Sequence, residues 1–506
     1  MTTETVQPLD YKRPEFVELT DDVSLSPLWN KDLAPTTIAQ RTWSVWSIAA
    51  LWISMSACIP TYMLASGLID QGMDWKQAVL TIFLGNLIVL IPMVLNAHAG
   101  TRYGIPFPVY CRASFGTIGS NVPAMLRALV ACGWFGIQTW LGGAAVFAIA
   151  VVMFPSLAPP PGTTGPTAAQ FVCFLIFWLI NVAVIVAGIE SIRILLNIKA
   201  PLLIVLGLIL LGWAYRAAGG FGPMLSQPSA FDPGHPKAGQ FWKVFWPALT
   251  GNIAFWATLS LNIPDFSRYA RSQRDQIVGQ SLGLPLTMAL YSFIGVAVTS
   301  STVIIFGHEI WDPVVLLQTF KSPATIVFSM LALILATLAT NIAANVVSPA
   351  NDFANLAPRL LGFRAGGLIT AFIGILMMPW KILETSGNYI FVWLGGYSNL
   401  LGAIGGILIC DYWFLRRRHL DLPALYDPRG RYSYGSGTNF SAVVALVVAI
   451  LPCIPGFLAV ATGGKLSILE PLHRLYDYNW FVSFGIAFGL YFVLMKSLGG
   501  ESHGNT

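Results

Sequence analysis

The chain has 506 residues, of which 55% are hydrophobic and 10% are charged. Soluble globular proteins carry about 25% charged residues, so this composition excludes an ordinary soluble protein. The formal net charge of +5 at pH 7 is spread over the loops and gives no indication of a nucleic-acid partner.

Beyond a polar arm at residues 1–40, apolar runs of about 20 residues follow one another along almost the whole chain, long enough to cross a bilayer as α-helices. The arm has no apolar segment of the kind found in a secretory signal peptide, so we expect a solvated cytoplasmic tail. Twelve spans are expected, at 43–68, 77–97, 122–154, 168–188, 195–217, 241–263, 280–306, 323–346, 366–386, 389–411, 439–461 and 478–497.

The loops differ in positive charge from one side of the expected bundle to the other. Lysine and arginine are about twice as frequent in the loops that follow the even-numbered spans, and such loops usually stay in the cytoplasm. The run Arg416-Arg417-Arg418 is part of this bias. We therefore expect both termini in the cytoplasm of a multi-pass protein of the plasma membrane.

Two of the expected spans, the first and the sixth, have features that interrupt helices. Pro60 and several hydroxyl side chains lie within span 1, and Thr250-Gly251-Asn252 lies within span 6. Interrupted membrane helices are tolerated where they line a cavity, and a pair in corresponding positions of two halves indicates a transporter site. Interruptions five spans apart predict two inverted five-helix repeats. Taken separately, each interruption has a simpler explanation, namely a kink at Pro60 in span 1 and closer helix packing at Gly251 in span 6.

Spans 3 and 8 carry polar side chains at helical spacing. Trp134 and Gln138 are four residues apart, so they share one face, where a ring could stack on a flat heterocycle and an amide could pair with its edge. Taken alone, both could equally be packing residues. In span 8, Thr337, Asn341 and Asn345 form one line, which a lipid-facing helix would not carry.

Other kinds of function lack their sequence signals. There is no nucleotide-binding loop, no row of carboxylates for a proton relay, and no His, Asp or Glu cluster of a membrane enzyme, so we expect no catalysis. The six cysteines form no C-x-x-C pair or Cys/His cluster, so neither disulfides nor a metal centre is expected. Lys381 and Glu384 are three residues apart in span 9, a spacing that allows an ion pair.

Several motifs together resemble the nucleobase–cation symporter family, type one, whose members carry hydantoins, allantoin, uracil, cytosine and related compounds. The similarity covers nearly the whole chain and is closest to allantoin and uracil carriers. The motifs are I-P-T-Y at 59–62, H-A-G-T-R-Y-G-I-P-F-P at 98–108, W-F-G-I-Q-T-W at 134–140, L-N-I-P-D-F-S-R-Y-A at 261–270, N-I-A-A-N-V-V-S-P-A at 341–350, P-W-K at 379–381 and D-Y-W-F-L-R-R-R at 411–418.

The resemblance implies an all-α integral membrane fold of twelve helices, with a five-plus-five inverted repeat like that of amino-acid/sodium symporters and two added C-terminal helices. It also implies cation-coupled secondary import of a small planar heterocycle or ureide by a rocking-bundle form of alternating access. The implied parts are the tail at 1–40, repeats at 41–217 and 218–411, a loop with the last two spans at 412–497, and a cytoplasmic tail at 498–506.

The resemblance assigns substrate-binding roles by position. Trp134 and Trp256 would sandwich the heterocycle, and Gln138 and Asn345 would hydrogen-bond its amide edges. Two positions depart from relatives. Phe255 replaces a glycine of the hydantoin carrier, and Cys58 replaces a Gln or Asn.

The resemblance also implies a cation site. Backbone oxygens of Ser54, Ala57 and Ala336 would bind sodium together with hydroxyl groups of span 8, where Thr340 matches one position and Ala339 occupies the other. A methyl group supplies no ligand, so we expect weak sodium coupling, or proton coupling in its place.

Other readings stay open at this point. Within transport, an amino-acid or amine carrier of the same architecture would aim the N-terminus of a broken helix at a carboxylate. A non-transporting membrane receptor would need an added signalling domain. The residues are compatible with allantoin, uracil, hydantoin and cytosine alike. Gly402 and Gly406 allow close helix packing within one chain or between two, so they set no oligomeric state.

Overall fold

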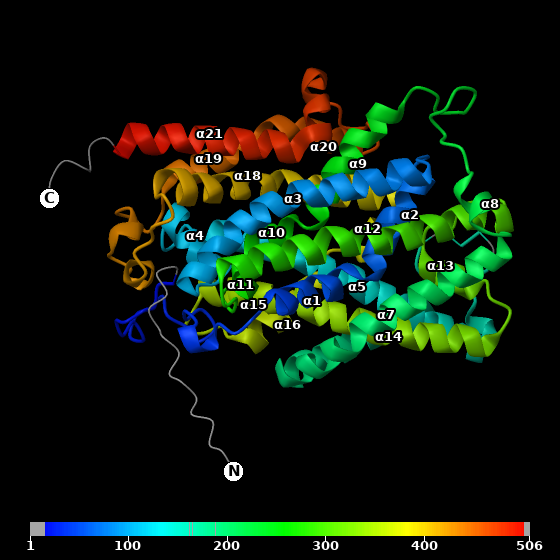
Figure 1. Cartoon of the computed structure of the whole chain (residues 1–506), viewed down its shortest axis with the longest axis horizontal. Coiled ribbons are helices and arrows are strands. Elements are labelled where there is room, and N and C mark those ends of the chain that lie inside the picture. The colour runs from blue at the N-terminus through cyan, green and yellow to red at the C-terminus, as the bar shows by residue number, and fades with distance from the viewer. Residues whose placement is uncertain (1–15, 161, 164, 188, 500–506) are drawn as a thin grey trace, which may run out of the picture.

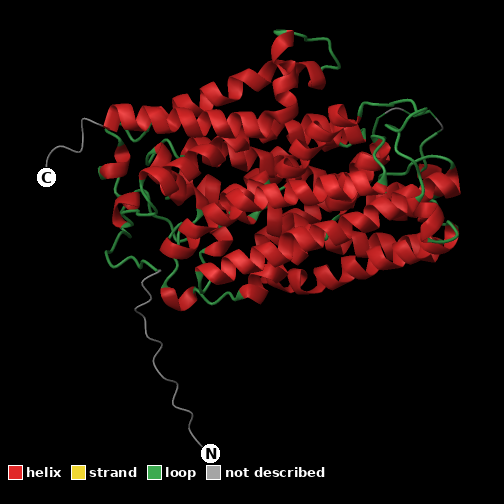
Figure 2. Ribbon diagram, turned by 45° about the horizontal axis from the view of Figure 1, so that its top comes forward, coloured by secondary structure: helices red, strands yellow, loops and turns green. Residues whose placement is uncertain are grey.

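The computed structural model describes residues 16–160, 162–163, 165–187 and 189–499. Over these residues the protein is helical and forms no β-strand, apart from one isolated bridge between Trp43 and Ala270 (Figure 2). The long helices run side by side, with α18 and α21 along one edge and α7 and α14 along the opposite edge (Figure 1). The α-helices are α1 (Val45–Ser56), α2 (Ile59–Asp70), α3 (Trp75–Tyr103), α4 (Phe107–Phe115), α5 (Asn121–Met153), α6 (Ala168–Ala187), α7 (Ile189–Ala217), α8 (Phe221–Leu225), α9 (Phe241–Phe255), α10 (Ala257–Asn262), α11 (Pro264–Ser267), α12 (Gln273–Phe306), α13 (Pro313–Gln318), α14 (Pro323–Asn345), α15 (Val347–Leu356), α16 (Phe363–Leu376), α17 (Pro379–Ile382), α18 (Gly395–Ile409), α19 (Phe440–Ile450), α20 (Ile454–Ala461) and α21 (Asn479–Gly499). Two π-helices, η3 (Asn388–Leu394) and η4 (Cys410–Leu415), flank α18.

Each expected membrane span falls on a helix of the described residues. Within that part of the chain, eight helices are long and apolar enough to cross a membrane, and the bent pair α1–α2 makes a ninth. Helix α16 is apolar but shorter, at Phe363–Leu376. The prediction of an all-helical, multi-pass architecture is therefore confirmed, while the count of twelve complete crossings stays a prediction.

The expected interruption of span 1 is present. Helices α1 and α2 meet at an angle of 56°, with Ala57 and Cys58 between them. Cys58 is extended, with φ −150° and ψ 161°. Pro60 is the second residue of α2, where its missing N–H costs nothing because no helical partner exists there. The break therefore follows directly from the position of the proline.

The interruption of span 6 lies later than predicted. Gly251 and Asn252 are inside α9. The side-chain amide of Asn252 donates to the carbonyl of Ala248, one turn earlier in the same helix, at 2.8 Å. The helix stops instead at Trp256. Gly251 serves packing, because a Cβ there would lie only 3.3 Å from the side chain and the carbonyl of Ile390 in η3.

The helix pairs show the pattern expected of inverted repeats. Helix α12, in the second position of the second half, packs along α1 and α2. Helix α3, in the second position of the first half, packs along α9 and α10. If the two halves are exchanged, each of these contacts becomes the other. The contacts of α3 with α12 and of α5 with α14 each join equivalent helices of the two halves, so the exchange leaves them unchanged. This reciprocity agrees with the five-plus-five arrangement, whose exact limits at 41–217 and 218–411 stay a prediction.

Span 9 is shorter than expected. Helix α16 ends at Leu376, although the hydropathy pattern predicts a helix over 366–386. Met378 then adopts the left-handed conformation, with φ 49°. It precedes Pro379, whose ring disfavours a helical residue before it and which cannot donate a hydrogen bond to the preceding turn.

The expected pair of Lys381 and Glu384 is wrong. Helix α17 covers only Pro379–Ile382, so Glu384 lies beyond its end and the spacing of three residues no longer brings the side chains together. The ion pairs found among the described residues do not include these two groups.

Residues 16–40, expected as a solvated arm, are bound to the ends of the bundle. Arg41 is 4% exposed and donates to the carbonyls of Thr101 at 3.2 Å and Arg102 at 3.1 Å, which belong to the last turn of α3. Other side chains of the bundle donate to main-chain carbonyls of the segment. These bonds are Arg112 to Leu28 (3.0 Å), Arg268 to Asp32 (3.1 Å) and Tyr426 to Leu33 (2.7 Å). The expected tails at 1–15 and 500–506 lie outside the described residues.

Glycines allow the bundle to pack closely where α1 crosses α12. A Cβ at Gly283 would lie 2.8 Å from the Trp52 Cβ and 2.9 Å from the Ala49 carbonyl oxygen. By contrast, a Cβ at Gly485 of α21 would meet no other atom within 4 Å. Small residues at helix crossings allow such backbone contact in membranes.

We predict that Gly283→Ala lowers the thermal stability of the purified protein, because overpacking of a close crossing costs about 1–3 kcal/mol. Gly485→Ala is the matched control, and it should be neutral or stabilising by up to about 1 kcal/mol, the helix-propensity gain. Thermal unfolding in one detergent compares the two variants. Equal melting temperatures for them would contradict the close crossing.

Candidate functional site

A buried cavity lies where the two broken helices meet α5 and α14. It is small, with about 40 Å³ of free volume. The structure brings all six predicted substrate-binding residues to its wall, namely Cys58, Trp134, Gln138, Phe255, Trp256 and Asn345, together with Thr340 from the predicted cation site. Its wall also includes Pro60, expected at the break of span 1, and four residues that were not predicted as site residues, namely Met55, Thr258, Leu259 and Ala344.

Aromatic rings form one side of the cavity. Phe255 contacts Trp134 at 5.3 Å between ring centroids and Trp256 at 5.0 Å, edge to face in both cases. Trp52 of α1, which the sequence did not indicate, contacts Trp256 edge to face at 5.2 Å. Phe255 therefore lies between the two tryptophans and limits the space that a ligand could occupy beside them.

The polar side chains of the cavity are held by an amide network. Asn345 donates to the Asn341 side chain at 3.0 Å, and Asn341 in turn donates to Thr139 of α5 and Asn181 of α6, both at 3.1 Å. This network fixes the orientation of Asn345 across three helices. The second amide of the cavity wall, Gln138, lies outside this network, and its buried Oε1 has no hydrogen-bond partner among the described residues.

The unpaired Gln138 oxygen is a chemical indication of a ligand. A buried acceptor without a partner costs free energy, about 1–3 kcal/mol, and is rare in native proteins. A ligand N–H would remove that cost. The wall carries no Asp, Glu, Lys, Arg or His side chain, so the arrangement suits a neutral, flat molecule with hydrogen-bonding edges.

The π-helix η3 closes another side of the site. Tyr389 and Trp393 contact the Trp134 ring, each at 6.2 Å between centroids, and the Tyr389 hydroxyl donates to the Pro60 carbonyl at 3.2 Å. Gly133 makes room for Trp393, since a Cβ there would lie 2.1 Å from its ring. π-Helical turns often occur at functional sites. Sequence reasoning missed these aromatic residues, because the approach of η3 to α5 is a tertiary contact.

The predicted cation residues are only partly gathered. Thr340 reaches the cavity wall, and its hydroxyl donates to the Ala336 carbonyl at 2.9 Å, one turn earlier on α14. Ala57 lies at the break of span 1, and α1 packs against α14. Ser54 belongs to α1, and Ala339 is buried in α14. Among the described residues, no group of three His, Cys, Asp or Glu side chains could hold a metal ion.

Comparison with known proteins extends over most of the chain. The family described as permeases for cytosine/purines, uracil, thiamine and allantoin matches residues 35–483. The chain is 46% identical over 488 residues to the purine-uracil permease NCS1 of Arabidopsis thaliana, covering 95% of this chain and 80% of the relative. It is 39% identical over 475 residues to the allantoin permease of Bacillus subtilis, covering 93% of each chain.

A solved structure of Mhp1, a nucleobase-cation-symport-1 family transporter in a closed conformation with bromovinylhydantoin bound, has a similar fold. The two are 26% identical and superpose with a TM-score of 0.75, over 94% of this chain and 96% of that one. Family, fold and chain coverage thus agree. The chain belongs to the nucleobase–cation symporter family, type one, and is a multi-pass membrane permease.

Proposed function

We propose that the protein imports a small, neutral, planar nitrogen heterocycle or ureide in symport with a cation. The observation that carries the proposal is the cavity at both helix breaks, where two tryptophans and two side-chain amides meet without any charged side chain. Relatives named for purine and uracil and for allantoin support this class of substrate.

The proposed binding mode follows from the chemistry of the wall. A flat ring would stack against Trp134 and Trp256, and the carboxamides of Gln138 and Asn345 would pair with its N–H and C=O groups. Phe255 would restrict the substrate to thin molecules, since it lies between the two tryptophans. Cys58 would contact the substrate from the break of span 1 through a weakly polar thiol.

Transport would proceed by alternating access, with the five-helix repeats at 41–217 and 218–411 moving relative to one another around the central cavity. The cation would bind near Ser54, Ala57, Ala336 and Thr340, and it would raise substrate affinity by the same factor by which substrate raises cation affinity. With Ala339 in place of a hydroxyl ligand, we propose weak sodium coupling, or proton coupling instead. Lysine and arginine are concentrated in the loops that follow the even-numbered spans, and this supports an orientation in the plasma membrane with both termini in the cytoplasm.

An amino-acid carrier of the same architecture is less well supported. The carboxylate and ammonium groups of an amino acid would enter a wall without charged side chains, which favours neutral ligands.

We predict that Gln138→Ala and Trp134→Ala abolish saturable uptake while the protein still reaches the membrane, because each removes a direct contact with the ring. Uptake of radiolabelled allantoin, uracil, hydantoin and cytosine by expressing cells measures the effect. Gln240→Ala, in the loop before α9, is the matched control and should transport normally. Normal uptake by Gln138→Ala would show that its proposed role is wrong.

We predict that Asn345→Ala weakens substrate binding by about 1–3 kcal/mol, the cost of leaving a buried polar group of the ligand unpaired. Equilibrium binding of the transported compound to purified protein measures the loss. Asn388→Ala, a partly buried amide at the start of η3 that does not line the cavity, should leave the affinity unchanged. Equal affinities for both variants would remove Asn345 from the site.

We predict that uptake depends only weakly on sodium, and that Ala339→Ser makes it more sodium-dependent by restoring a hydroxyl ligand. Uptake measured while sodium and the pH gradient are varied separately distinguishes the two ions. Steep sodium dependence of the unaltered protein, with no response to the pH gradient, would refute the proposed coupling.

A further inference from the structure

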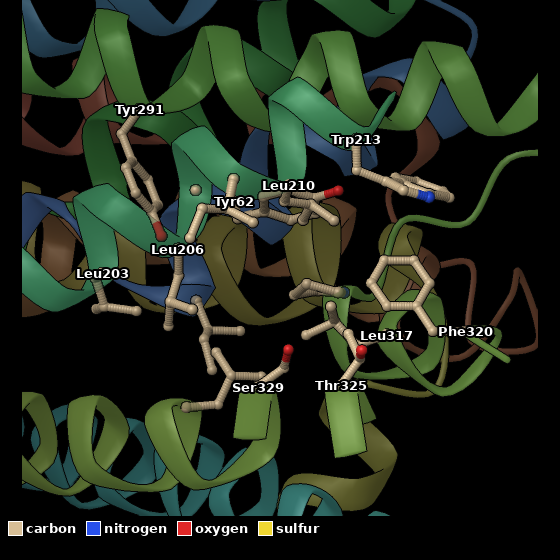
Figure 3. Close-up of a pocket in the computed structure, with 15 residues that line it drawn as sticks. Tyr62, Leu203, Leu206, Leu210, Trp213, Tyr291, Leu317, Phe320, Thr325 and Ser329 are labelled. Atoms are coloured by element: carbon tan, nitrogen blue, oxygen red, sulfur yellow. The ribbon is translucent and has the colours of Figure 1, made fainter. Parts of the chain in front are cut away.

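A second cavity lies on the other side of the span 1 break, between α2, α7, α12 and α14 (Figure 3). It has about 90 Å³ of free volume, roughly twice that of the cavity beside Gln138. Apolar side chains form most of its wall, including Leu206 and Leu210 of α7 and Leu333 of α14. An apolar cavity of this kind excludes water and accepts small apolar molecules.

Several hydroxyl groups break the apolar lining. Tyr62 is 3% exposed, and its buried hydroxyl faces the Thr299 side chain of α12 but makes no hydrogen bond of normal geometry among the described residues. Figure 3 shows the hydroxyls of Tyr291 and Ser329 directed into the same space. A buried phenol without a well-formed hydrogen bond can donate to a ligand at little cost, here in place of its contact with Thr299. The cavity thus offers an apolar wall with donors at fixed points.

The two cavities share one short segment. Ile59 lines the second cavity, while its neighbours Cys58 and Pro60 line the substrate cavity. These three residues form the break between α1 and α2 and the first turn of α2. A molecule in the second cavity therefore contacts the same short backbone segment that forms one wall of the proposed substrate site.

The second cavity is bordered by exposed residues of α7 and α14, where it can open. Thr325 in the first turn of α14 and Ile209 on α7 belong to its lining and are exposed, Ile209 at 61%. Trp213, near the end of α7, lies at the same level (Figure 3). Because these helices are membrane spans, an apolar molecule dissolved in the bilayer can reach this opening directly.

We infer that this cavity is a second ligand site, which takes a small, neutral, largely apolar molecule carrying one hydrogen-bond acceptor. Tyr62 donates to that acceptor, and the leucine side chains enclose the apolar part. A bound molecule holds α2 against α7 and α14, and it thereby slows the movement of span 1 that transport requires. Binding is independent of the proposed substrate, whereas the effect on transport rests on the proposed function.

Two glycines of α7 provide a matched test of binding. Gly207 lines the cavity, and a Cβ there would meet Ile294 and Tyr291 at 3.4 Å, an ordinary contact distance, so we expect Gly207→Leu to occupy cavity space. A Cβ at Gly212, five residues later, meets no atom within 4 Å. Gly212→Leu therefore adds the same side chain on the same helix outside the cavity.

The probe is 4-fluoroacetophenone, an aromatic ketone, titrated against the purified full-length protein in detergent. We expect a saturable rise in the melting temperature of the unaltered protein and of Gly212→Leu, and no rise for Gly207→Leu. No saturable rise in the unaltered protein, or the same rise in both glycine variants, would overturn the site, since the probe would then act only through the micelle.

The variant Tyr62→Phe removes only the hydroxyl and keeps the ring. Its affinity for the probe should fall about threefold to tenfold, the usual effect of losing one hydrogen bond. An unchanged affinity would overturn the assignment of Tyr62 as the donor.

Uptake tests the coupling between the two cavities. The probe should lower the maximal uptake rate of whichever heterocycle is transported, leave its KM unchanged, and have no effect on Gly207→Leu. A rise in KM at constant maximal rate would place the probe in the substrate cavity and overturn the inference. If none of the heterocycles is taken up, the proposed function fails, while the melting-temperature titration still decides the second site.

Discussion

The need of a membrane helix to satisfy its own backbone hydrogen bonds governs this structure. Where the chain leaves the helical conformation at membrane depth, the exposed N–H and C=O groups must be buried in protein or face a cavity. Spans 1 and 6 meet this condition together, since their breaks at Cys58 and Trp256 lie on one cavity. The packing of α12 on α1 and α2, and of α3 on α9 and α10, encloses both breaks.

The amide network gives the cavity a rigid side opposite the breaks. Asn341 joins α14 to α5 and α6 through Thr139 and Asn181, and it holds Asn345 in a fixed orientation. A buried network whose members are paired specifies a single arrangement more strongly than apolar packing does. The proposed substrate cavity therefore combines one wall held by hydrogen bonds with one wall made of broken helices, an arrangement compatible with the proposed alternating access.

Local features of the sequence predicted much of this arrangement. Pro60 reveals the break of span 1, because proline acts on its own turn, and the spacing of Trp134 and Gln138 places them on one face. The break of span 6 was misplaced, since Gly251 serves a contact with η3 that no local pattern reveals. For the same reason, the aromatic residues of η3 could not be predicted, because helices far apart in the sequence bring them to Trp134.

The segment before α1 shows a different kind of recognition. Arg112, Arg268 and Tyr426 bind it through main-chain carbonyls, which supply part of its attachment. The side chains of Asn30 and Thr36 supply another part, since they donate to the carbonyls of Pro358 and Arg268. Every residue type offers the same carbonyl group. Substitutions at the other positions of the segment can therefore accumulate while the carbonyl contacts persist, whereas replacement of Asn30 or Thr36 also removes a side-chain bond to the bundle.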